Sequence, residues 1–170
     1  MNVTLIGMSG AGKSRVGKLL AEQLGLEFVD IDRHLLEPSR GKPLQDILDE
    51  MGDEQFMQWE EQLMIEKTAG KDGLLISTPG SVVYEERAMK HLNDISHIVY
   101  LEVPFDVVDK RIGSESAMRG IVGRRSRSLR QLFDERVPLY EKYAHYKIPT
   151  HGEEAPTIVE KIAGFLHKKI

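Results

Sequence analysis

The chain has 170 residues, a formal net charge of −4 and no cysteine. This length suffices for one domain with a sizeable buried core. The lack of cysteine excludes disulfides and thiolate metal sites, and the acidic balance argues against general nucleic-acid binding. No apolar run reaches the roughly 18 residues of a membrane span, and the first residues lack the basic region of a signal peptide, so we expect a cytoplasmic protein.

Short apolar runs alternate with longer segments of helical periodicity along the chain. The short runs predict strands at Val3–Ile6, Glu27–Asp30, Leu74–Ser77, Ile98–Glu102 and Tyr146–Pro149. Strands that alternate with helices are typical of βαβ units. The sequence therefore predicts an α/β fold around a parallel sheet of five strands.

The first predicted helix runs from Lys13 to Leu24, with Val16, Leu19 and Leu20 on one face. Further helices are expected at 32–37, 44–51, 54–69, 104–111 and 128–143, and from 156 onward. Three of these fill one long connection, approximately 32–70, which we expect to be a substrate-binding insertion. We expect residues 1–170 to form a single domain.

A glycine-rich segment, Gly7 to Ser14, joins the first predicted strand to the first predicted helix. Its sequence G-M-S-G-A-G-K-S matches G-x-x-x-x-G-K-[ST], a loop whose backbone N–H groups surround phosphates. Lys13 can reach the β- and γ-phosphates, and the Ser14 hydroxyl can bind Mg²⁺. An unrelated glycine-rich turn is the alternative, but the position between strand and helix favours nucleotide binding. The candidate nucleotide-binding residues here are Gly10, Ala11, Gly12, Lys13, Ser14 and Arg15.

Two aspartates follow the second predicted strand, in the sequence F-V-D-I-D-R. Asp30 and Asp32 therefore stand at the carboxyl edge of the sheet, where ligands of open α/β folds bind. In phosphoryl transfer, one carboxylate can order Mg²⁺ and the other can accept the proton of the attacking hydroxyl. Asp30 and Asp32 are therefore candidates for these two roles. The alternative for Asp32 is a helix N-cap.

Between 111 and 136 the acidic chain becomes locally basic. Glycines at 113, 120 and 123 flank part of this region, so we expect a lid at approximately 112–127 that brings guanidinium groups to phosphates. For the arginines from 124 to 130, a solvated basic helix face is an equal alternative. The seven arginines are Arg111, Arg119, Arg124, Arg125, Arg127, Arg130 and Arg136, against three acids.

The glycine-rich loop, the D-x-D pair and the lid arginines together resemble the shikimate kinase family, within the nucleoside monophosphate kinase-like P-loop fold. The likeness covers almost the whole chain and implies a three-layer sandwich, ATP and Mg²⁺ as cofactors, and a monomer. It also implies that Asp30 helps to hold Mg²⁺, and that the lid arginine Arg119 contacts ATP phosphates and acts in catalysis with Lys13 and Asp32. Pro156 falls where the family stacks the adenine, and Arg111 of the basic region is a further candidate nucleotide-binding residue.

The resemblance assigns acceptor binding to Asp32, to Gly80 and to Arg136, the arginine of R-V-P-L-Y. Two positions depart from the family pattern. The family's F-R-x-x-E-E reads F-M-Q-W-E-E, so Met57 replaces an arginine, and the glycine triplet reads Pro79-Gly80-Ser81. A charge-assisted bond contributes about 1.5–3 kcal/mol, so losing one weakens binding roughly ten- to a hundred-fold. Arg33 is a candidate substitute, and core packing is the alternative role for Met57.

These residues predict an ATP- and Mg²⁺-dependent kinase of a small hydroxylated metabolite. Shikimate, giving 3-phosphoshikimate, is the first expected acceptor because Asp32, Gly80 and Arg136 are present. The alternatives are a kinase of another hydroxy acid, polyol or nucleotide, and an ATP-binding regulatory protein without kinase activity. No nucleic-acid or membrane partner is expected.

Overall fold

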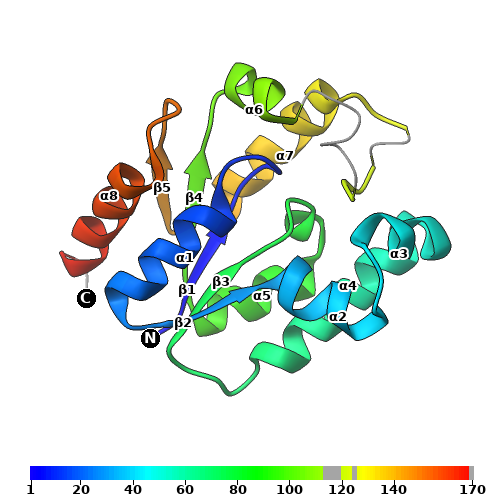
Figure 1. The fold of residues 1–170 in the computed structure, drawn as a ribbon, viewed down its shortest axis with the longest axis horizontal. Coiled ribbons are helices and arrows are strands. Elements are labelled where there is room, and N and C mark those ends of the chain that lie inside the picture. The colour runs from blue at the N-terminus through cyan, green and yellow to red at the C-terminus, as the bar shows by residue number, and fades with distance from the viewer. Residues whose placement is uncertain (113–119, 124–125, 169–170) are drawn as a thin grey trace.

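A computed structural model describes residues 1–112, 120–123 and 126–168. Its five strands form one parallel sheet in the order β2-β3-β1-β4-β5 (Figure 1). The strands are β1 (Val3–Ile6), β2 (Glu27–Asp30), β3 (Leu74–Ser77), β4 (His97–Glu102) and β5 (Tyr146–Pro149). All five predicted strands are confirmed, with β4 starting one residue earlier than expected.

The helices follow the predicted order with two differences. They are α1 (Lys13–Leu24), η1 (Ile31–Leu36), α2 (Glu37–Arg40), α3 (Leu44–Met51), α4 (Asp53–Thr68), η2 (Val82–Tyr84), α5 (Glu86–Ile95), α6 (Phe105–Ile112), α7 (Leu129–Tyr143) and α8 (Ala155–His167). Helix α5 was not predicted, although Ala88, Met89 and Leu92 form its buried face at helical spacing. Within the described residues, no helix has the length and apolar character needed to cross a membrane.

The second difference concerns the segment after β2, where an α-helix was expected over 32–37. The structure has a π-helical turn, η1, followed by the short helix α2. The side chain of Asp30 caps η1 by accepting a hydrogen bond from the Arg33 N–H, and the Asp30 N–H donates to Nδ1 of His34. Because the cap is Asp30, the alternative role of Asp32 as N-cap is wrong.

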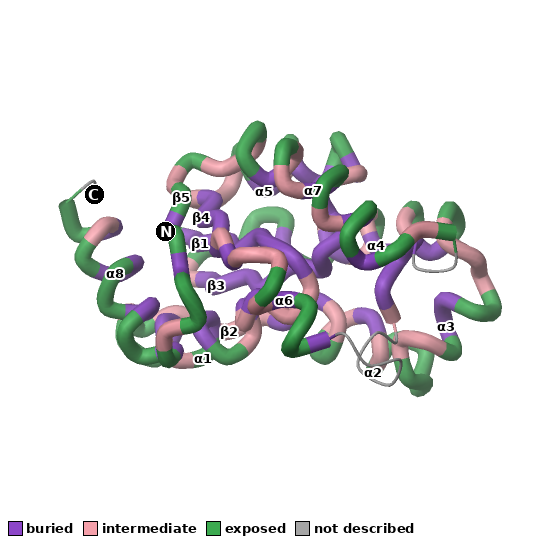
Figure 2. The backbone as a smooth tube through the Cα atoms, turned by 90° about the horizontal axis from the view of Figure 1, so that it is seen from above, coloured by how far each residue is buried: buried purple, intermediate pink, exposed green. Residues whose placement is uncertain are grey.

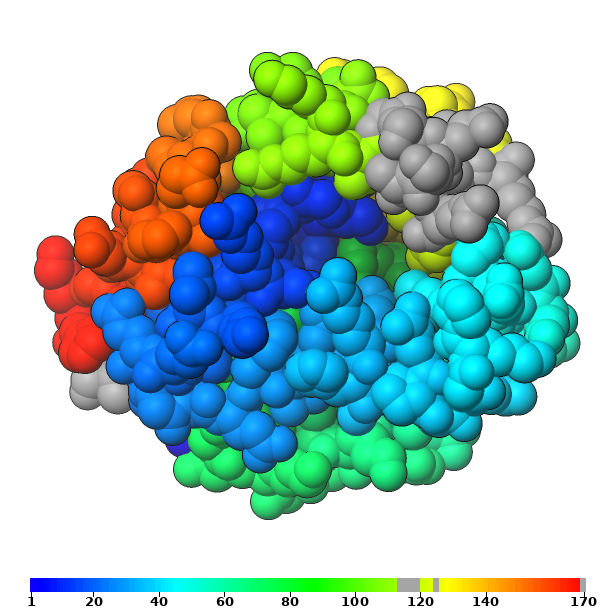
Figure 3. Space-filling view, in the orientation of Figure 1, coloured from blue at the N-terminus to red at the C-terminus, as the bar shows by residue number. Residues whose placement is uncertain are grey.

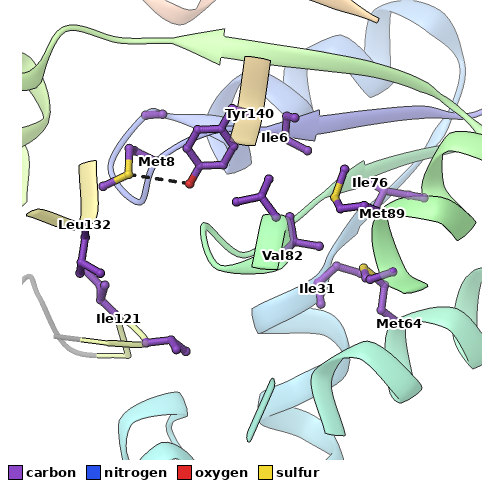
Figure 4. Close-up of a cluster of buried hydrophobic side chains, with 14 of the residues drawn as sticks. Ile6, Met8, Ile31, Met64, Ile76, Val82, Met89, Ile121, Leu132 and Tyr140 are labelled. Carbon is purple, nitrogen blue, oxygen red and sulfur yellow. Dashed lines mark hydrogen bonds between the residues drawn. The ribbon is translucent and has the colours of Figure 1, made fainter. Parts of the chain in front are cut away.

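Alternating side chains of the strands supply two separate apolar layers, and the buried strands lie between the helices (Figure 2). Val3, Leu5 and Leu75 point to one face, where α1 and α8 cover them. Ile6 and Ile76 point to the other face, toward the cluster that includes residues of α4, α5 and α7 (Figure 4). This arrangement is the expected three-layer sandwich.

The register of the sheet brings three strand ends to one edge. Ser77, the last residue of β3, pairs with Leu5 of β1 on one side and with Asp30 of β2 on the other. The loops that leave β1, β2 and β3 therefore start at the same edge, although their sequence positions are far apart. Since β1 leads into the glycine-rich loop and β2 ends at Asp30, the predicted site residues meet here.

Helix α1 approaches the sheet closely because Gly17 has no side chain. A Cβ at this position would lie 2.7 Å from Phe28 and 3.0 Å from Leu75. By contrast, a Cβ at Gly164 in α8 would have no atom within 4 Å. The two helical glycines therefore differ in what a methyl group would meet.

We expect Gly17→Ala to lower the free energy of unfolding by about 1–3 kcal/mol, because overpacking outweighs the helix propensity of alanine. The matched control Gly164→Ala should be neutral or stabilise by up to about 1 kcal/mol. Chemical denaturation of both variants measures the difference. Equal effects of the two substitutions would contradict the close packing of α1.

Candidate functional site

The loop between β1 and α1 has the conformation that its glycines allow. Gly10 and Gly12 adopt φ angles of 78° and 91°, in the left-handed region that glycine favours. A Cβ at Gly10 would also lie 2.8 Å from Ile112 of α6. The loop thus places its backbone N–H groups at the start of α1, as a phosphate-binding loop requires.

The Lys13 side chain folds back over this loop. Its ammonium group donates to the carbonyl oxygens of Gly7 and Met8, at 2.7 and 2.9 Å. Burial lowers the pKa of Lys13 to about 8, and the nearby carboxylates of Asp32 and Asp30 partly oppose that effect. The cation is therefore held at the mouth of the loop, where phosphates of a nucleotide would meet it.

Ser14 and Asp30 lie together at the carboxyl edge. The Ser14 hydroxyl donates to Oδ2 of Asp30 at 2.5 Å, so α1 and β2 bring two oxygen ligands into contact. Mg²⁺ in nucleotide sites takes one or two protein oxygens, with phosphates and water completing the octahedron. This oxygen pair fits such an ion.

Asp32 lies next to this pair on η1. Its Oδ1 is buried and has no hydrogen-bond partner among the described residues. Burial raises the pKa of Asp32 to about 7, Asp30 adds to the rise, and Lys13 opposes it. A carboxyl group that titrates near neutral pH is suited to accept a proton from a hydroxyl.

A cavity of about 780 Å³ joins these groups at the carboxyl edge. Figure 3 shows the molecule hollowed here, between the blue N-terminal segment and the light-green region of α6. Candidate residues that line the cavity are Gly10, Gly12, Lys13, Ser14, Arg15, Asp30, Asp32 and Gly80. Arg33, the proposed substitute for the missing arginine, also lines it.

Arg136 lies in a small adjoining cavity that Asp32 and Gly80 share. Its side chain is 1% exposed and donates to the Val122 carbonyl at 2.8 Å and to the Tyr84 hydroxyl at 3.3 Å. A Cβ at Gly80 would lie 3.0 Å from Nη1 of Arg136, so this glycine leaves room beside the guanidinium. The two predicted acceptor residues are therefore neighbours.

Tyr140 was not among the predicted site residues, yet it shapes this part of the site. Its hydroxyl donates to the Gly80 carbonyl at 2.6 Å and contacts the Met8 sulfur at 3.7 Å (Figure 4). Its ring stacks on Tyr100 with centroids 5.2 Å apart. Tyr140 thus contacts both Gly80 and the start of the phosphate loop. Its position in the R-V-P-L-Y motif was the sequence signal that could have identified it.

The two departures from the family motif lie in different places. Pro79, Gly80 and Ser81 line the small cavity that contains Arg136, whereas Met57 lines a separate surface groove. Met57 is half-buried and packs against the core, as its alternative role requires. Glu60, one turn later on α4, lines the cavity that contains Arg136. Glu60 belongs to the F-M-Q-W-E-E motif, but no role was predicted for it.

A further cavity of about 350 Å³ lies on the other side of the loop, between α6 and the start of α8. It is lined by candidate residues Ala11, Arg15 and Arg111, and Arg111 donates to the Gly10 carbonyl at 3.0 Å. Pro156 is exposed in the first turn of α8 and lines neither this cavity nor the two described above.

The expected lid is described only in part. Arg119, Arg124 and Arg125 lie outside the described residues. The described turn 120–123 contacts the insertion: the Gly120 N–H donates to the Gln45 side chain at 2.7 Å, and the Gly123 N–H to Asp53 at 3.1 Å.

Two of the arginines beyond this turn form ion pairs on the surface. Arg130 pairs with Asp134 at 3.1 Å, and both side chains are mostly exposed. Arg127 pairs with Glu135 and also lies over the Tyr84 ring. These contacts favour the solvated-face alternative for Arg130 of α7 (Leu129–Tyr143). Arg127 precedes this helix, is 34% exposed and lies against Tyr84.

Comparison with known proteins agrees with this geometry. The family model described as shikimate kinase matches residues 9–167. A shikimate kinase of Persephonella marina is 34% identical over 96% of this chain and 97% of its own length. One from Francisella tularensis subsp. novicida is 34% identical over 97% of this chain and 94% of its own length.

Solved structures give the same result. A shikimate kinase from Acinetobacter baumannii, in complex with shikimate, superposes with a TM-score of 0.85 and 28% identity, covering 99% of this chain and 93% of that chain. For one from Aquifex aeolicus the TM-score is 0.81 and the identity 25%, with 99% and 98% covered. The chain belongs to the shikimate kinase family, whose members are ATP-dependent small-molecule kinases.

Proposed function

We propose that this protein transfers the γ-phosphoryl group of ATP to a hydroxyl group of shikimate, giving 3-phosphoshikimate. The observation that carries the proposal is the convergence of Lys13, Asp32 and Gly80 on one cavity, with Arg136 in the adjoining one. Such a site needs a phosphate cradle, a base for the hydroxyl and a cation for the acceptor, and these residues supply all three.

In this proposal the loop 7–14 holds the phosphates and Lys13 neutralises charge on the transferring group. Asp32 accepts the proton of the attacking hydroxyl, which its raised pKa favours. Arg119 would add a positive charge to the phosphates from the lid at 112–127, and Arg111, Arg15 and Pro156 would flank the nucleoside. Most of the catalysis is then positioning and charge stabilisation.

Mg²⁺ is the metal that this oxygen-rich site fits, and Ser14 and Asp30 would hold it. When bound, the ion neutralises phosphate charge and orients the phosphoryl group. The 2.5 Å contact between the two side chains already groups their oxygens on one side of the cavity.

The acceptor would lie between Asp32 and Arg136, over Gly80, with the insertion 32–70 as its outer wall. Arg136 is held by two neutral acceptors, the Val122 carbonyl and the Tyr84 hydroxyl. Its charge therefore remains available for a carboxylate, which is the group that guanidinium binds best. The active protein is proposed to be a cytoplasmic monomer.

Coupled ADP release with Mg-ATP tests the function. We expect turnover with shikimate and little or none with other hydroxy acids, polyols, AMP, CMP or UMP, or without acceptor. Mass spectrometry of the product should show a shikimate phosphate ester. Turnover with another acceptor alone would replace shikimate, and ATP binding without any turnover would favour the regulatory alternative.

We expect Asp32→Asn to lower kcat about 10²–10⁴-fold, because the amide cannot accept the hydroxyl proton. The KM for ATP should change much less, since Asp32 lies on the acceptor side of the loop. Glu160→Gln, the same chemical change at an exposed position of α8, should leave both constants unchanged. Steady-state kinetics of the three proteins decides, and an Asp32→Asn enzyme with full turnover would rule out this base.

A further inference from the structure

Two buried carboxyl groups lie behind the acceptor pocket, and the proposed mechanism does not use them. Glu60 of α4 is 0% exposed, and Glu85, just before α5, is 6% exposed. Oε2 of Glu60 and both carboxyl oxygens of Glu85 have no hydrogen-bond donor among the described residues. The Ser81 hydroxyl lies 3.5 Å from Oε1 of Glu60, which is too far for a strong bond.

The side chains of Glu60 and Glu85 interact with each other, and each changes the pKa of the other. Two ionised carboxylates that meet in a buried site repel each other and lose their hydration, so such pairs retain a proton. A proton placed between them gives one group a donor and the other an acceptor. This arrangement gives a partner to Oε2 of Glu60 and to one of the two carboxyl oxygens of Glu85.

Charged groups on several elements face the pair. Asp32 from η1 disfavours ionisation of Glu60, and Glu61 from α4 disfavours ionisation of Glu85. Arg136 from α7 favours ionisation of Glu60, but burial is the larger effect and raises its pKa well above the ordinary value. Burial also raises the pKa of Glu85, to about 8. Arg87 of α5 is engaged by Glu61 at 3.8 Å.

One member of the pair, Glu60, lies in the wall of the proposed acceptor pocket. Glu60 lines the small cavity that also contains Asp32 and Arg136, and Arg136 is the one cation among the described residues that line it. Met57 and Glu85 line the same surface groove on the outer side of α4. The Met57 side chain is uncharged. An ionised Glu60 would therefore pair with Arg136, which would be its counter-charge.

We propose that Glu60 and Glu85 share a proton in the folded protein, and that this proton keeps the charge of Arg136 available for a carboxylate of the acceptor. When the proton leaves, the Glu60 carboxylate competes with the acceptor for the guanidinium. Glu60 is thus a positioning residue that sets acceptor affinity through Arg136. The inference rests on the proposed function, since it takes shikimate as the acceptor.

The test is the affinity for shikimate, measured by calorimetry without ATP, from about pH 6.5 to about pH 9. We expect the wild-type affinity to fall at least about tenfold over this range, as the pair ionises. Glu60→Gln keeps the site neutral and should lose less than about threefold. Asp32 and Lys13 titrate in the same range in both proteins, and Asp32 faces Glu60, so the difference between the two pH profiles is the quantity that tests the pair.

Two further variants sharpen the result. Glu66→Gln changes an exposed carboxylate of the same helix and should follow the wild type. Met57→Arg places a guanidinium one turn from Glu60 and beside Glu85, so the pair ionises without taking charge from Arg136. We expect this variant to bind shikimate with little pH dependence. Its absolute affinity is not the readout, because the introduced arginine can also contact the acceptor carboxylate directly. Parallel pH profiles for the wild type and Glu60→Gln, or a flat wild-type profile, would overturn the proposal.

Thermal stability tests the shared proton without any ligand. Burial raises the pKa of Glu60 well above its ordinary value and the pKa of Glu85 to about 8, whereas an unfolded glutamate loses its proton near pH 4.5. The retained protons therefore stabilise the fold at low pH, and this contribution declines as pH rises. Between about pH 6 and pH 9, the Tm of the wild type should therefore fall about 5 °C more than the Tm of Glu60→Gln.

The two measurements separate the proposals. Failure of shikimate to bind at every pH would count against the proposed function, while the difference in Tm would still establish the shared proton. Equal changes in Tm for the wild type and Glu60→Gln would overturn the shared proton even if shikimate is the acceptor.

Discussion

The parallel pairing of β1 and β2 on either side of β3 is the constraint on which the site depends. With Ser77 opposite both Leu5 and Asp30, the chain must leave three strands at one edge. Three segments therefore lie together at this edge: the phosphate loop, the D-x-D pair and the segment that carries Gly80. The chemistry depends on this register, because the residues of the site follow strands that end at the same edge of the sheet.

Charge is the second organising quantity. The site gathers Lys13, Asp30, Asp32 and Arg136 in or beside one cavity, and burial moves the pKa values of Lys13 and Asp32 toward neutrality from opposite sides. Each group is thereby closer to exchanging a proton than it would be in water. The same desolvation acts on Glu60 and Glu85, where it retains a proton instead of promoting a transfer.

The sequence was sufficient for the strands and the phosphate loop, because apolar alternation and the G-x-x-x-x-G-K-[ST] spacing are local signals. It was insufficient where the structure depends on contacts between distant segments. The raised pKa of Glu60 depends on its burial and on Glu85, 25 residues away. The hydrogen bond from the Asp30 N–H to Nδ1 of His34 accompanies η1 and is local, but no periodicity in the sequence indicated it. Helix α5 was missed although its apolar spacing was readable. The position of Arg119 lies outside the described residues.

The close seat of α1 on the sheet has a consequence for how the protein can change over time. The missing methyl group at Gly17 sets the spacing between helix and sheet, and Ser14 sits on that helix one turn earlier, in contact with Asp30 of β2. The spacing between α1 and the sheet therefore determines the position of Ser14 relative to Asp30 as well as the packing of the core. Substitutions that lift the helix alter packing and phosphate chemistry together, so neither property can drift independently of the other.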